Sequence, residues 1–305
     1  MRHKASQGSA PREEASPLAA ECAPPGLHGA DPSYLHAIIE RRLGQLVPPT
    51  ALHPGALHAA MRDILLSPGK RLAPLLAIAA ALQLDMSEHA VLDLGCALEM
   101  VDAASRLMDT LPGTNHAARL QSQPAGVGRC GDDVALLAAI SLLSRAFGVV
   151  ADAPGVEECV RLEAGTSLSL AVGSLGLCGV RFDDLRPTGH PAPTGDEVSR
   201  RTSSLLFPLA AEFAGRVARL DEERLAHLIS FASHVGHAYH LLDATRDASA
   251  PRAPLRAART RELLAEHVMG AGDASRRLGP NDEGHEPLRL FLRSAFGDAV
   301  EASPC

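Results

Sequence analysis

Apolar residues recur at spacings of three and four along most of the chain, which is the periodicity of an amphipathic α-helix. Ser67, Pro68 and Gly69 interrupt one such pattern and predict the end of a helix there. We see no stretch with the strict alternation of a long β-strand, so we predict an all-α protein. The expected helices cover residues 32–47, a segment ending before Ser67, and residues 72–84, 87–110, 133–150, 156–178, 196–217, 222–247, 256–276 and 286–300.

The first 30 residues differ from the rest of the chain. They carry scattered Pro, Ser, Gly and charged residues without periodicity, which is typical of a flexible leader. We therefore predict a flexible N-terminal leader over residues 1–30 and a single helical domain over residues 31–305.

Composition narrows the class of protein. Hydrophobic residues make up 46% of the chain while aromatic residues make up only 3%, so the core must be aliphatic, which suits close-packed helices. The net charge of -7 argues against binding of the nucleic-acid backbone, so we expect no nucleic-acid partner. We expect no transmembrane segment, because no apolar run reaches the length of a membrane span. The six cysteines form no C-x-x-C pair, which favours free thiols in the cytoplasm.

Two groups of polar residues lie on otherwise apolar helical segments, and each group spans two helical turns. Carboxylates that face the inside of an aliphatic bundle need a counter-charge, which is usually a metal ion or a metal with a bound anion. The alternative is that the first group is the exposed face of an amphipathic helix and that His240 with Asp243 is an ordinary i,i+3 pair. The two groups are Asp102, Ser105 and Asp109, and His240, Asp243 and Asp247.

Gly69, Lys70 and Arg71 precede a predicted helix and place two cations beside a flexible glycine. The backbone N–H groups at a helix N-terminus and neighbouring cations together form an anion site. A solvated basic turn is the alternative.

Several segments resemble the trans-isoprenyl diphosphate synthases, the polyprenyl synthetase family. They are the stretch from Leu65 to Leu75, the run from Leu98 to Pro112 and the pair Arg201-Thr202. The resemblance extends from about Leu57 to Asp247 and depends on order and spacing as well as residue type. It implies an isoprenoid synthase-type helical bundle around a central cavity.

The resemblance also implies roles for individual residues. In the family a Gly-Lys-Arg segment holds the diphosphate of one substrate, and this chain has Gly69, Lys70 and Arg71. Arg201 and Thr202 stand where the family has Lys-Thr, and His240 stands at the Gln of the second motif, so these are further substrate-binding candidates.

The aspartate-rich motifs of the family are incomplete in this chain. Of the first motif only Asp109 remains, with Thr110 and Asn115 at the other two positions, whereas the second motif keeps Asp243 and Asp247. In the family such carboxylates hold Mg²⁺ ions that neutralise the departing pyrophosphate. Asp109, Asp243 and Asp247 are therefore the candidate catalytic residues and the candidate ligands of an incomplete Mg²⁺ site.

The resemblance thus implies a protein of isoprenoid biosynthesis that acts on isoprenyl diphosphates. Its nominal reaction condenses isopentenyl diphosphate with an allylic diphosphate, and the lost aspartates predict an activity that is reduced or lost. The alternatives are a non-catalytic regulatory subunit of an active prenyl diphosphate synthase and a repurposed isoprenoid-binding protein. Because residues 133–150 are strongly apolar, we expect a homodimer or a heterodimer with an active synthase.

Overall fold

A computed structural model of the chain describes residues 31–111, 131–185, 195–246, 253–281 and 284–297. Within these ranges the side chains of residues 183–185, 195–204, 243–246 and 253–259 are not described. The described residues form α-helices and one short 3-10 helix, with no strand among them. The prediction of an all-α fold is confirmed.

Most helices begin and end within a few residues of the predicted positions. The first helix shows why, because Asp31 caps it by accepting a hydrogen bond from the Ser33 amide at 2.9 Å, and Pro32 occupies its first position. The helices are α1 (Pro32–Leu46), α2 (Gly55–Leu65), α3 (Leu72–Gln83), the 3-10 helix η3 (Glu88–Ala90), α4 (Leu92–Asp109), α6 (Asp132–Ala151), α7 (Glu158–Val172), α8 (Leu177–Leu185), α9 (Gly195–Val217), α10 (Glu222–Arg246), α11 (Ala253–Leu278) and α12 (Pro287–Phe296).

The predicted single helix over residues 156–178 is wrong. The chain forms α7, turns between Gly173 and Gly176, and begins the separate helix α8. A Cβ atom on Gly176 would lie 2.1 Å from the backbone oxygen of Ala171, so this turn needs a residue without a side chain. The turn places α8, which the helical pattern did not predict, beside α9.

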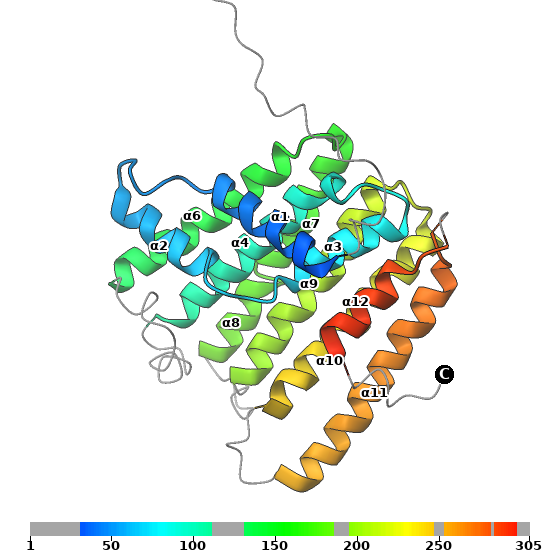
Figure 1. Ribbon diagram of the computed structural model, residues 1–305. Helices are drawn as coiled ribbons and strands as arrows, with labels where there is room; N and C mark the ends of the chain where they lie inside the picture. Colours follow the sequence, from blue (N-terminus) through cyan, green and yellow to red (C-terminus); the bar gives the residue numbers. More distant parts are fainter. Residues whose placement is uncertain (1–30, 112–130, 186–194, 247–252, 282–283, 298–305) are drawn as a thin grey trace, which may run out of the picture.

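Helix α4 forms the centre of the bundle and contacts α3, α6 and α9 (Figure 1). It approaches α3 so closely at Gly95 that a Cβ atom on this residue would lie 2.8 Å from the Cα atom of Pro74. All its residues are buried except Asp102, Arg106, Met108 and Asp109, which lie in its C-terminal half. The central helix therefore carries its accessible polar groups at one end only.

Helix α6 borders the bundle and packs against α2, α4 and α7 (Figure 1). By length and composition alone it could cross a membrane, contrary to our expectation that no apolar run is long enough. An apolar helix at the core of a helical bundle can have the same length and composition.

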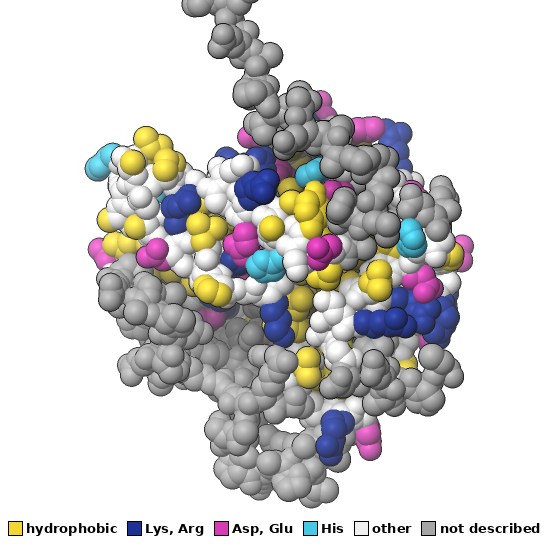
Figure 2. All heavy atoms as spheres, in the orientation of Figure 1, with side chains coloured by type: hydrophobic (Ala, Val, Ile, Leu, Met, Phe, Trp, Pro, Cys, Tyr) yellow, Lys and Arg dark blue, Asp and Glu magenta, His cyan; other side chains and the backbone are white. Residues whose placement is uncertain are grey.

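On the face shown in Figure 2, basic and acidic side chains lie side by side over α1 and α12.

Candidate functional site

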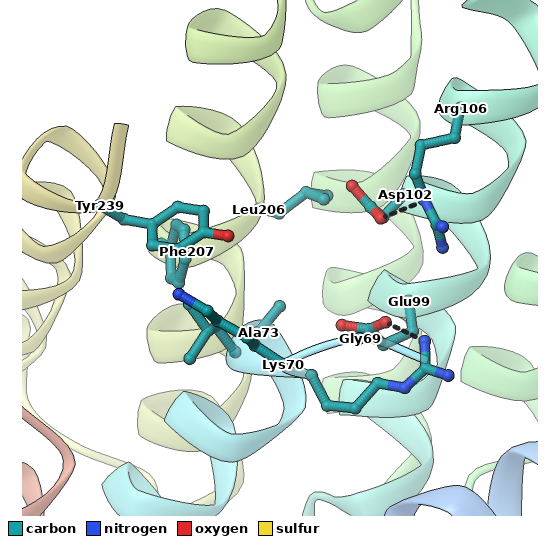
Figure 3. A pocket seen from close by; sticks show the side chains of 11 residues that line it. Gly69, Lys70, Ala73, Glu99, Asp102, Arg106, Leu206, Phe207 and Tyr239 are labelled. Atoms are coloured by element: carbon teal, nitrogen blue, oxygen red, sulfur yellow. Dashed lines mark hydrogen bonds and ion pairs between the residues drawn. The ribbon is translucent and has the colours of Figure 1, made fainter. Parts of the chain in front are cut away.

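A cavity of about 220 Å³ lies where the turn before α3 meets α4, α9 and α10. Lys70, Asp102 and Arg106 contribute charged groups to its wall, and Phe207 and Tyr239 contribute aromatic rings (Figure 3). A wall that combines charged groups with aromatic rings suits a ligand that has a polar head and an apolar tail.

Lys70 brings a positive charge to the aromatic side of the cavity. Its ammonium nitrogen lies 5.3 Å from the ring centroid of Tyr239, within the range of a cation–π contact (Figure 3). The Lys70 side chain is exposed, whereas the next residue, Arg71, is only 3% exposed. The two cations of the predicted anion site therefore have different environments.

Arg71 has left-handed backbone angles, φ 51° and ψ 41°, immediately before the first residue of α3. This conformation costs a residue with a side chain about 1–2 kcal/mol, so contacts of the side chain must hold it. The Arg71 guanidinium donates to Glu40 at 2.7 Å, to Glu99 at 3.1 Å and to the backbone oxygen of Ser67 at 2.8 Å. Arg71 borders the cavity but directs its hydrogen bonds to the protein itself.

Glu99 is a buried carboxyl group on α4, and burial raises its pKa to about 7, with the nearby charge of Asp102 acting in the same direction. The charge of Arg71 lowers the pKa and opposes these two effects. Near neutral pH the wall of the cavity therefore holds a carboxyl group that changes its charge.

Asp102 has a positively charged partner in the structure. Arg106, one turn later on α4, donates to Asp102 at 3.0 Å (Figure 3). It also donates to the Ser67 hydroxyl at 3.1 Å. The spacing of four residues is the ordinary spacing of an ion pair on a helix. As a result, Arg106 balances the charge of Asp102 at this part of the wall.

Asp109 lies two turns beyond Asp102 on α4. Its two carboxylate oxygens accept hydrogen bonds from the two terminal nitrogens of Arg181 on α8, at 3.0 Å for Nη2 and Oδ2. Arg181 also donates to the hydroxyl of the buried Ser105. Two members of the first polar group, Ser105 and Asp109, are therefore held by an arginine from another helix.

The surroundings of Asp109 differ from those of a Mg²⁺ ligand. Mg²⁺ needs oxygen ligands at about 2.0–2.1 Å in an octahedral arrangement, whereas both oxygens of this carboxylate face a guanidinium. In the described part of the chain, no group of three or more His, Cys, Asp or Glu side chains could hold a metal ion. The described residues around Asp109 therefore do not fit Mg²⁺.

The other predicted site residues fall into two sets. Gly69 borders the cavity and accepts a hydrogen bond from His36 at 3.0 Å, and His240 is buried at 8% exposure in α10, next to Tyr239. The second set lies outside the described side chains, so the predicted roles of its members in substrate and Mg²⁺ binding stay predictions. That set is Arg201, Thr202, Asp243 and Asp247.

Sequence reasoning missed several residues of the site. The pairing of Asp102 with Arg106 was visible as a spacing of four residues, and Tyr239 directly precedes His240. Phe207 and Arg181 gave no comparable signal, because each comes from a helix far from α4 in the sequence.

A second polar group, formed by three histidines, joins α10 to α11. The Nδ1 atoms of His234 and His267 lie 3.1 Å apart, and the ring of His237 stacks on His267 at 4.9 Å between centroids. Gly270 makes room for the His234 ring, since a Cβ atom on Gly270 would lie 2.5 Å from this ring. Burial lowers the pKa of His234 and of His267, and the charge of His237 lowers both further.

Comparison with protein families matches residues 54–256 to the polyprenyl synthetase family. The matched range includes the cavity and the Asp109 pair. It also includes the segments that carry the resemblance read from the sequence.

Relatives of known activity are similar over about the same range. The geranylgeranyl diphosphate synthase of Pantoea ananas is 38% identical over 217 residues, which cover 70% of this chain and 72% of that enzyme. The geranylgeranyl diphosphate synthase of Pseudescherichia vulneris is 34% identical, with 68% and 69% covered.

The fold itself has solved counterparts. The apo structure of an FPP/GFPP synthase from Zymomonas mobilis superposes with a TM-score of 0.73 at 23% identity, covering 86% of this chain and 96% of that one. At this level of identity the likeness concerns the fold, and it agrees with the predicted helical bundle.

Proposed function

This chain belongs to the polyprenyl synthetase family of isoprenoid biosynthesis, and we propose that it binds an isoprenyl diphosphate in the cavity between α3, α4, α9 and α10. The observation that carries the proposal is the position of Lys70 at a wall that continues into Phe207 and Tyr239. The ammonium group would bind a diphosphate oxygen, and the rings would pack against the prenyl chain.

We further propose that condensation of isopentenyl diphosphate with an allylic diphosphate is reduced or lost. The reaction needs positive groups that neutralise the negative charge of the departing pyrophosphate. Arg71 and Arg106 already bond to carboxylates of the protein, and Asp109 bonds to Arg181. Asp243 and Asp247 stay the candidate ligands of a Mg²⁺ ion, and such an ion would neutralise part of the diphosphate charge.

A turnover assay tests this proposal. Isopentenyl diphosphate is supplied with each of the C5, C10 and C15 allylic diphosphates in Mg²⁺, and binding of the same allylic diphosphates is measured by calorimetry. We expect binding, with turnover several orders of magnitude below about 1 s⁻¹, a rate at the lower end of ordinary enzymes. Turnover near that rate would contradict the loss of activity, and absence of binding would contradict the proposed ligand.

Lys70→Gln sharpens the assay. We expect it to weaken diphosphate binding about tenfold or more, since it removes the cation at the aromatic wall. Arg41→Gln is the matched control, because it removes one exposed positive charge from α1, at a position that does not border the cavity. Equal effects of the two variants would mean that only the overall charge of the protein matters.

A second candidate function is that of a subunit that binds an active prenyl diphosphate synthase. The observation that favours it is the exposed apolar face of α6, where Leu136 is 46%, Leu137 54% and Ile140 52% exposed. Large exposed aliphatic side chains at this spacing are typical of a protein interface. We propose that this face contacts a second copy of the chain or a related synthase.

Light scattering of the purified protein, and co-expression with an active synthase, separate these two partners. Leu137→Lys should disrupt either assembly, whereas Leu290→Lys, which changes a comparably exposed leucine on α12, should leave it intact. A monomer that changes neither the rate nor the product length of a co-expressed synthase would exclude this second function.

We also propose a cytoplasmic location. The described cysteines Cys96, Cys159 and Cys178 are free thiols, which supports a reducing compartment. Fractionation of cells that express the chain would test the assignment.

A further inference from the structure

The pair formed by Asp109 and Arg181 is more enclosed than an ordinary surface ion pair. The side chains of Arg181 and Asp109 are only 13% and 23% exposed. Each terminal nitrogen of the guanidinium bonds to one carboxylate oxygen, and Nη2 also bonds to the buried Ser105. This two-point geometry fixes the plane of the guanidinium, so Arg181 has a defined position at the end of α4.

The guanidinium also has an unused donor. Its Nε atom is enclosed and has no hydrogen-bond partner among the described residues. A buried donor without a partner is uncommon in proteins, and one on a positively charged group suits an anionic acceptor. This observation is independent of the pairing with Asp109, and it indicates that Arg181 has capacity for a ligand.

The position of the pair relates it to the cavity. Asp109 follows Asp102 by seven residues on α4, which corresponds to about 10 Å along the helix at 1.5 Å per residue. Asp102 borders the cavity. Neither Asp109 nor Arg181 lines the cavity itself, so a diphosphate bound at this pair would occupy a place separate from the one at Lys70.

We propose that Arg181 takes the place of a divalent metal ion at Asp109, so that the first aspartate motif offers a diphosphate a fixed guanidinium. The inference rests on the proposed binding of isoprenyl diphosphates. It follows from the misfit between Asp109 and Mg²⁺, because a metal ion would have to displace hydrogen bonds from both carboxylate oxygens and approach a positive charge. The guanidinium neutralises Asp109 and presents its own N–H groups to the diphosphate. This contact between Arg181 and the diphosphate does not need a metal ion bound elsewhere.

The first experiment needs no diphosphate. Mn²⁺, which prefers oxygen ligands as Mg²⁺ does, is titrated into the full chain and the bound ions are counted by electron paramagnetic resonance. We expect Arg181→Gln to gain at least tenfold in affinity at one site, and the double variant Arg181→Gln with Asp109→Asn to lose that gain. Asp109→Asn alone should bind Mn²⁺ like the unchanged protein. A strong reduction by Asp109→Asn alone would overturn the inference, because it would show that the metal displaces Arg181.

The second experiment measures binding of inorganic pyrophosphate by calorimetry with and without Mg²⁺. We expect Arg181→Gln to weaken binding at least tenfold without Mg²⁺ and to make binding more dependent on Mg²⁺. Arg181→Lys keeps the charge but loses the two-point geometry, so it should keep Mn²⁺ away from Asp109 while it binds pyrophosphate less well than the unchanged protein. Unchanged pyrophosphate binding in Arg181→Gln would overturn the role of Arg181 as a diphosphate contact.

The two experiments fail in different ways. If no variant binds pyrophosphate or an isoprenyl diphosphate, the proposed function fails, while the Mn²⁺ titration still decides whether Arg181 excludes a metal from Asp109. Thermal melting of each variant is recorded first. Should Arg181→Gln prove unfolded, pyrophosphate binding by Arg181→Lys tests the diphosphate contact, and the Mn²⁺ titration of Asp109→Asn tests whether a metal binds Asp109 in the unchanged protein.

Discussion

Two of the arginine-carboxylate groups of helix α4 differ in what surrounds them. Arg71 and Glu99 lie within the core, with side chains 1% and 9% exposed, whereas Arg181 and Asp109 lie at the end of the helix and are 13% and 23% exposed. The first arginine has three acceptors, and the second keeps an enclosed Nε without a partner among the described residues. The comparison indicates that the same pairing can serve mainly folding in one place and ligand binding in the other.

Breaking the buried group should have the largest effect on stability. Arg71→Met leaves Glu99 without its partner and removes the contacts that hold the left-handed turn before α3, so we expect a loss of about 3–5 kcal/mol. Urea unfolding followed by circular dichroism measures it. Arg106→Met is the control, since its pair with Asp102 is about one-third exposed and should contribute about 1 kcal/mol or less. Equal losses of stability in the two variants would contradict the expected difference between the buried and the partly exposed ion pair.

The second-largest expected effect is the pH dependence of stability that the buried Glu99 produces. The folded pKa of Glu99, about 7, is above the ordinary value of 4.5, so the folded state binds this proton more tightly than the unfolded state. The resulting stabilisation is complete below pH 4.5 and is lost as the pH rises through 7. The loss is about 3 kcal/mol at most, at 1.36 kcal/mol for each pH unit.

Glu99→Gln should remove this dependence, because an amide can still accept a hydrogen bond from Arg71. We therefore expect the stability of the variant, relative to the unchanged protein, to increase between pH 5 and pH 7.5. Unfolding curves at several pH values measure this difference. A difference that stays constant over the range would show that Glu99 is ionised in the folded state throughout.

The pair at the end of α4 should matter less for stability. Arg181→Gln removes charged hydrogen bonds from a partly exposed carboxylate, and we expect a loss of about 1–2 kcal/mol. The same urea unfolding experiment applies, with Arg216→Gln as the control for a partly exposed arginine on α9. A loss as large as that of Arg71→Met would mean that Arg181 is a core residue, contrary to its proposed role in ligand binding.

The sequence allowed prediction of the helices and of one wall of the cavity, for reasons that are local. Periodicity fixes a helix wherever one face is apolar, and Lys70 follows directly from its position between a helix breaker and a helix. Arg181 could not be predicted in the same way. Its contact with Asp109 joins residues 72 positions apart, and the turn at Gly173–Gly176 that creates α8 was hidden within an apparently continuous helical pattern.

The smallest expected effect is the pH response of the histidines between α10 and α11, which has the opposite sign to that of Glu99. Burial lowers the folded pKa of His234 and His267, and the charge of His237 adds to this effect, while Glu266 opposes it. The folded state therefore binds these protons less tightly, so this contribution to stability is present above pH 6.5 and is lost as the pH falls. His267→Asn should reduce the loss of stability as the pH falls below 6.5 and leave the Glu99 response, which runs between pH 4.5 and 7, unchanged. Since the histidine and Glu99 responses come from separate helix pairs, the double variant with Glu99→Gln should show the sum of the two single effects. An unchanged decline in His267→Asn would assign the acid response to other groups.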